Sequence, residues 1–268
     1  MRLSISNIAW APEAAAAVYP RLCDAGVSGL EIAPGLLFPG RDPFAASREE
    51  CREIREMIGS YGLQFTSMQS LLYGAEGAEL FGPGKARRAL AAGLERAIAL
   101  AGRLGVPNLV FGSPGNRRIP EGLEAPESVW RPAFRALGDR AAAAGTVLAL
   151  ETNPAAYGTN FMVTLAETLA VARAVDHPAV RVNLDLGALI LTGEIAAIDG
   201  WLQAALPLIH HVHLSAPHLA PIAEVETELR RLVSALDAAG YRGWYSVEMR
   251  AAPGALDAAL ALLERLHA

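Results

Sequence analysis

The chain has 268 residues, of which 52% are hydrophobic and 19% charged, and its formal net charge is −5. This composition can build a substantial core, and an acidic balance without a dense Lys/Arg run argues against nucleic acid or an anionic membrane surface as a partner. Since no apolar segment approaches 18 residues and the start does not resemble a signal peptide, we expect a cytoplasmic protein with small, soluble partners.

Short β-rich runs alternate with longer segments of helical period along the whole chain, a pattern typical of repeated βα units around a parallel sheet. In chain order, the predicted strands cover residues 3–6, 29–32, 64–68, 108–111, 147–151, 180–185, 209–214 and 244–248. The predicted helices lie near residues 12–25, 47–60, 85–104, 127–144, 163–175, 193–206, 222–239 and 255–267.

Eight strands and eight helices predict one (β/α)8 barrel domain over residues 1–268, which fits the usual barrel length of about 250 residues. Several helices are followed by glycines that can adopt a left-handed C-terminal cap, at Gly26, Gly62, Gly105, Gly145 and Gly240. A doubly wound open sheet would use the same elements, but neither GxGxxG nor GxxxxGK[ST] follows the first strand. The closed barrel is therefore favoured.

Polar residues end four successive strands, where a barrel places its active site. The segments are LALETN, VNLDLG, HHVHLS and YSVEMR, and the residues are Glu151, Asp185, His213 and Glu248. Each is separated from the next by about one βα unit, so the four side chains should meet at one rim. A ring of three carboxylates repels itself without a cation, so the pattern predicts a metal site.

Three carboxylates and one imidazole favour Mn²⁺, Co²⁺ or Mg²⁺ over a thiolate-rich zinc site, although Zn²⁺ stays an alternative. Strand alternation places His211 on the same face as His213, with His211 expected to support the ligands or to pack. Cys23 and Cys51 lie in helix-like segments and are interpreted as packing thiols.

On these residues, the sequence resembles the sugar phosphate isomerase/epimerase family of xylose isomerase-like barrels. The resemblance rests on ETNPAAYGTNF, NLDLG, HVHLS and SVEM together, and it extends over the full chain. It implies that the four strand-end residues bind one metal ion. It also implies that Glu151 and Glu248 act as acid and base.

The chain departs from the ketose 3-epimerases of that family at three positions. Those enzymes grip the ketose with a Glu six residues after the first ligand, a His three after the Asp and an Arg six after the ligand His. Here these positions hold Tyr157, Ala188 and Leu219. The resemblance therefore implies the same metal chemistry on a different substrate.

Other polar residues near strand ends are candidates for binding the substrate. They are Asn7, Glu31, Gln69, Ser113, Asn153, His218 and Arg250, and the last two are favoured because they follow predicted ligands directly. Arg117 and Arg118, in FGSPGNRR, could meet a phosphate or carboxylate, or could simply be solvated.

We expect an isomerase or epimerase that acts on a sugar, cyclitol or related hydroxy-carbonyl compound by proton abstraction through a metal-bound enediolate. A dehydratase of the inosose dehydratase type would share the first step. A nuclease is disfavoured, because all six histidines lie from His177 onward, and four intact ligands argue against a metal-free binding barrel. A homodimer or homotetramer is left open.

Overall fold

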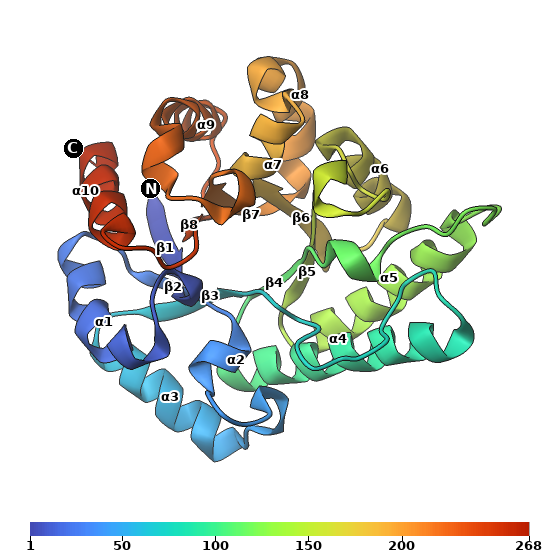
Figure 1. The fold of residues 1–268 in the computed structure, drawn as a ribbon, viewed down its shortest axis with the longest axis horizontal. Coiled ribbons are helices and arrows are strands. Elements are labelled where there is room, and N and C mark those ends of the chain that lie inside the picture. Colours follow the sequence, from blue (N-terminus) through green and yellow to red (C-terminus); the bar gives the residue numbers. More distant parts are fainter. Residues whose placement is uncertain (268) are drawn as a thin grey trace.

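Eight parallel strands form a closed barrel, and helices surround it (Figure 1). The computed structural model describes residues 1–267. The strands are β1 Arg2–Ser6, β2 Gly29–Ile32, β3 Gln64–Met68, β4 Asn108–Phe111, β5 Val147–Glu151, β6 Val180–Asp185, β7 Ile209–Ser215 and β8 Trp244–Glu248. The predicted (β/α)8 barrel is therefore confirmed, and each strand lies where the sequence predicts it to within one residue.

The first and last strands close the ring. β1 pairs in parallel with both β2 and β8, and Leu3 is opposite Tyr245. The register is regular except at two bulges, one between Leu30 and Glu31 and one between Val182 and Asn183. A bulge turns a side chain away from the direction that regular pairing would give it.

The helices follow the predicted order with two additions. Their bounds are α1 Ala15–Asp24, α2 Pro34–Leu37, α3 Arg48–Ser60, α4 Gly84–Leu104, α5 Glu127–Ala143, α6 Leu165–Val175, α7 Leu186–Leu191, α8 Ile198–Ala205, α9 Glu226–Ala238 and α10 Ala255–His267. The sequence did not predict α2 and α7. α7 begins immediately after β6, and the Asp185 side chain accepts a hydrogen bond from the backbone N–H of Ala188 at its first turn.

Local signals in the sequence account for several helix ends. α3 begins with a capping box in which the Ser47 hydroxyl accepts from the Glu50 N–H while the Glu50 carboxylate accepts from the Ser47 N–H. α4 ends at Gly105, whose φ of 70° is left-handed. The other four predicted cap glycines also have positive φ, so these helix ends are confirmed.

The core lies between the barrel and its helices, and the inside of the barrel contains several buried polar residues. Ser4 and Thr66 are buried there and share a hydrogen bond of 2.7 Å. Glu31, His211 and His213 are also buried inside the barrel.

Along residues 1–267, no helix combines the length and apolar character needed to cross a membrane.

Candidate metal centre and cavity

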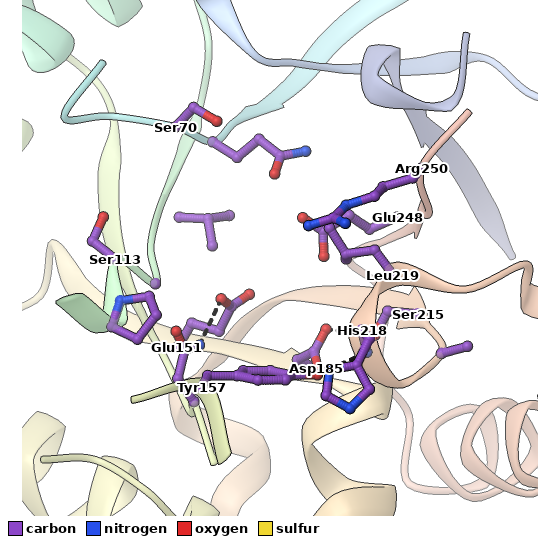
Figure 2. Close-up of a pocket in the computed structure, with 16 residues that line it drawn as sticks. Ser70, Ser113, Glu151, Tyr157, Asp185, Ser215, His218, Leu219, Glu248 and Arg250 are labelled. Carbon is purple, nitrogen blue, oxygen red and sulfur yellow. Dashed lines mark hydrogen bonds between the residues drawn. The ribbon is translucent and has the colours of Figure 1, made fainter. Parts of the chain in front are cut away.

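Four successive strands bring one potential metal ligand each to the carboxyl-terminal mouth of the barrel. β5 ends with Glu151, β6 ends with Asp185, β7 contains His213 and β8 ends with Glu248. One ligand atom from each lies within 4.8 Å of the other three. The sequence-predicted residues are thus brought together, and the three carboxylates point into one cavity (Figure 2).

The His213 imidazole directs Nδ1 toward the carboxylates. Nδ1 lies 3.2 Å from Glu151 Oε1 and 3.2 Å from Glu248 Oε2. Despite these short distances, neither oxygen is placed to share a hydrogen bond with Nδ1, which is buried without a partner among the described residues. A buried nitrogen with that environment is what a metal ligand requires.

Hydrogen bonds hold two of the carboxylates in place. Ser215 Oγ donates to Asp185 Oδ2 at 2.5 Å. Asn183 Nδ2 donates to Glu151 Oε1 at 2.7 Å, and Asn153 Nδ2 reaches Glu151 Oε2 at 3.1 Å. Sequence reasoning missed Ser215 and Asn183. Strand alternation could have found them, because each lies two residues from a ligand and so on the same strand face.

Gly112, directly after β4, leaves the room that the Glu151 carboxylate occupies. A Cβ atom at position 112 would lie 2.5 Å from Glu151 Oε2. Such a distance is well inside van der Waals contact, so a side chain at this position would displace the carboxylate.

The negative charges in the cluster oppose one another. Burial and the charges of Glu151 and Glu248 raise the pKa of Asp185 well above its usual range. Burial also raises the pKa of Glu248, against the opposing effect of His213. For His213, burial alone would lower the pKa, but the surrounding carboxylates outweigh it and raise the pKa well above its usual value.

A divalent cation fits this cluster. Three carboxylate oxygens and one imidazole nitrogen form a donor set suited to Mn²⁺, Co²⁺ or Mg²⁺, and also usable by Zn²⁺. The three acidic side chains are only 11–14% exposed. Partly dry carboxylates so close together are stabilised by a positive charge that lies between them.

A cavity of about 530 Å³ opens above the cluster. Glu151, Asp185 and Glu248 form its charged floor. Tyr157 and His218 form one side of it and Ser70 lies on the opposite side, while the Arg250 side chain extends in beside Glu248 (Figure 2). This size suits a small molecule.

Five of the seven predicted substrate contacts line this cavity, namely Gln69, Ser113, Asn153, His218 and Arg250. The lining, taken over the described part of the chain, does not include Asn7 or Glu31. Asn7 instead bonds to the backbone of Ala33, with its Oδ1 accepting at 2.7 Å. Glu31 is fully buried beneath the cluster.

The cavity rim contains residues in an unusual backbone conformation. Ser70, Ser113, His218 and Leu219 have φ between 42° and 60°, and all four line the cavity. This left-handed region is costly for residues with a side chain. His218 is further held by Tyr157, whose hydroxyl accepts from the His218 N–H at 3.0 Å and whose ring centroid lies 5.3 Å from the imidazole.

The two arginines after β4 lie away from the cavity. Arg117 is fully buried and donates to the backbone carbonyl of Glu151 at 2.8 Å, and burial lowers the pKa of Arg117 to about 10. Arg118 is exposed and reaches the carbonyl of Gly158. Neither arginine is placed to bind a substrate phosphate in the cavity.

Cys23 and Cys51 are free thiols.

Comparison with known proteins assigns this architecture. A family model described as xylose isomerase-like TIM barrel matches residues 20–266. No curated protein is recognisably similar in sequence. Among solved structures, a D-allulose 3-epimerase from Methylomonas sp. has a TM-score of 0.74 at 19% identity, covering 100% of this chain and 97% of that one.

Two further solved structures show the same fold. An L-ribulose 3-epimerase has a TM-score of 0.72 at 18% identity, covering 99% of this chain and 92% of its own. A 3-keto-D-glucoside 4-epimerase from E. coli has a TM-score of 0.69 at 20% identity, with 98% of each chain covered. At such identities the likeness extends to the fold alone.

Proposed function

The chain belongs to the xylose isomerase-like TIM barrel family, and from that premise we propose that it is a divalent-metal-dependent isomerase or epimerase. Its substrate is a sugar, a cyclitol or a related hydroxy-carbonyl compound. The single observation that carries the proposal is the convergence of four potential ligand atoms within 4.8 Å on the floor of a small-molecule cavity. Similar folds with epimerase names support the same reaction class.

The four strand-end residues Glu151, Asp185, His213 and Glu248 would hold the ion. When bound, a divalent cation supplies electrostatic stabilisation of the negative charge that develops on a substrate oxygen. Mn²⁺, Co²⁺ and Mg²⁺ match the oxygen-rich donor set best.

Glu151 and Glu248 would transfer the proton. They come from strands three positions apart in the ring, and their carboxylates approach the cavity floor from different sides (Figure 2). A substrate carbon between them would present one face to each. If one glutamate takes the proton and the other returns it to the opposite face, epimerisation results. If one glutamate does both, isomerisation between neighbouring carbons is favoured.

The substrate would be oriented by polar groups on the cavity wall. Gln69 and Asn153 offer amides, and His218 and Arg250 offer donors near the mouth. Val110 and Leu219 contribute apolar surface to the same lining. We propose that these contacts select the hydroxyl pattern, as a few placed polar groups do in small-molecule sites.

The proposal is tested by proton exchange. Purified protein is stripped of metal, reloaded separately with Mn²⁺, Co²⁺, Mg²⁺ or Zn²⁺, and incubated in D₂O with sugars, cyclitols and their phosphates. We expect metal-dependent deuterium incorporation next to a carbonyl carbon, detected by NMR. Loss of water from the substrate would instead identify a dehydratase. Failure to bind any of the four metals, with chelators leaving stability unchanged, would favour a metal-free binding barrel.

A further inference from the structure

We propose that Glu31 is a positioning residue, which holds the His213 imidazole through Nε2 so that Nδ1 faces the metal position. This inference rests on the proposed metal-dependent function. Glu31 lies on β2, across the barrel interior from the ligands, and neither oxygen of its carboxylate reaches the cavity lining. It would act through His213 and not on the substrate.

The contact between the two side chains is direct and fully buried. Glu31 Oε2 lies 2.9 Å from His213 Nε2, and both side chains are 0% exposed. The opposite ring nitrogen, Nδ1, is the one that faces Glu151 and Glu248. The imidazole therefore lies between the single carboxylate of Glu31 on one side and the carboxylates of Glu151 and Glu248 on the other.

The structure also fixes Glu31 itself. Gln69 Nε2 donates to Glu31 Oε1 at 3.1 Å, so each carboxylate oxygen has a partner. The β2–β3 bulge falls between Leu30 and Glu31, where it can redirect this side chain. Gln69 in addition lines the cavity, so the same network touches the cavity wall and the ligand.

The contact with Glu31 determines which nitrogen of the His213 imidazole carries a proton. A neutral imidazole carries one N–H donor and one acceptor nitrogen, and an ionised carboxylate can only accept. When Glu31 holds a proton on Nε2, the proton that a metal ion displaces is the one on Nδ1, and the Nδ1 lone pair then faces the ion. Glu31 thereby selects both the tautomer and the ring orientation of His213.

A second metal ion could in principle use Glu31, His211 and His213, whose ligand atoms also lie close together. His213 Nε2 already has a hydrogen-bonding distance to Glu31, and His211 Nε2 lies 3.3 Å from the same oxygen. These residues are at most 1% exposed and line no part of the cavity over the cluster. The geometry favours an orienting hydrogen bond over a second site.

The first test compares metal affinity. We expect Glu31→Gln to weaken Mn²⁺ binding by about 10- to 100-fold in calorimetry, because its amide can turn N–H toward Nε2 and favour the wrong tautomer. Glu31→Asp, which keeps a carboxylate, should bind Mn²⁺ with intermediate affinity. Thr66→Val is the matched control, since it breaks the buried bond to Ser4 in the same barrel interior. It should bind Mn²⁺ within about twofold of the parent.

Thermal unfolding without metal separates positioning from packing. A purely structural role predicts that Glu31→Gln lowers the metal-free midpoint but binds Mn²⁺ as the parent does, which would overturn the inference. If the parent protein itself binds no Mn²⁺, the proposed function fails. If the parent binds Mn²⁺ and Glu31→Gln binds it equally well, only the positioning role fails.

A second measurement needs no variant. ¹⁵N NMR of the parent with Zn²⁺ as a diamagnetic probe reports the state of each His213 nitrogen. We expect a protonated Nε2 and a coordinated Nδ1. Coordination through Nε2, or a proton on Nδ1, would overturn the inference even if the Glu31 variants fail to fold.

Discussion

Asp185 is the candidate ligand whose ionised form is most clearly disfavoured, because burial and two neighbouring carboxylates raise its pKa. We predict that Asp185→Asn weakens Mn²⁺ binding by more than ~10²-fold. This loss exceeds the usual loss of affinity when a residue that only hydrogen-bonds to a metal ligand is replaced. The amide removes the charge but preserves the size of the side chain. Calorimetry measures the affinity, and circular dichroism confirms the fold. Equal affinity in variant and parent would remove Asp185 from the site.

Glu248 is expected to have two roles that one substitution can separate. Glu248→Gln still offers an oxygen to the metal but cannot accept a proton. At saturating metal, we predict a loss of solvent-deuterium incorporation of ~10²-fold or more. Metal content is measured in the same sample. Full exchange by a loaded variant would make Glu248 a ligand alone and leave Glu151 as the base.

The sequence predicted which candidate ligands converge better than it predicted the residues that support them. The convergence of Glu151, Asp185, His213 and Glu248 could be predicted because the strands of a barrel end at one common rim. Glu31 also lies near a strand end, so the sequence predicts that it contacts the substrate. Its actual place depends on how far the side chain lies below the rim and on a bulge, and neither is visible in local sequence.

At the scale of elements, Gly112 after β4 leaves space for the side chain of Glu151, a candidate ligand on the neighbouring β5. We predict that Gly112→Ala weakens Mn²⁺ binding while changing metal-free stability little, because the new Cβ meets the flexible end of Glu151 and no backbone. Calorimetry and urea unfolding give the two quantities. The matched control is Gly115→Ala, three residues along the same loop, where a Cβ meets nothing within 4 Å. Unchanged affinity in Gly112→Ala would show that Glu151 binds metal from another position.

The loops that follow the strands should determine the substrate. Tyr157 and Leu219 line the cavity, and Ala188 is buried in α7, so none of the three supplies the charged contacts that ketohexose 3-epimerases of this family use. We predict that fructose is a poor substrate. A fructose kcat/KM near ~10⁴ M⁻¹s⁻¹ or more, an ordinary enzyme value, would contradict this. The best substrate from the exchange screen is the positive control.

Element positions followed from sequence period, with informative exceptions. The strands were predicted to within one residue because each is a short apolar run between turn signals. α7 was missed because it has six residues and starts directly after the residue that ends β6. Pro34–Leu37 was missed for a similar reason, since four residues show no helical period.

For the whole molecule, we predict that metal removal lowers stability. An ion bound only by the folded state adds about 2.7 kcal/mol at a free concentration of 100 Kd. Chelation should therefore lower the unfolding midpoint, and Mn²⁺ should restore it. A chelator already saturated with Ca²⁺ serves as the control. An unchanged unfolding midpoint after verified metal loss would contradict this expectation.

We also expect residues 1–268 to unfold in one transition, as a single barrel domain should.

The left-handed residues around the cavity mouth carry a consequence for the history of this protein. At Ser70, Ser113, His218 and Leu219 the backbone conformation is one that glycine adopts at lower cost. Selection for stability alone would favour glycine there, whereas selection for the proposed activity would favour the side chains that line the cavity. We expect relatives that lack the four candidate metal ligands to hold glycine or asparagine at these positions more often than relatives that retain them. A comparison of aligned sequences would measure this.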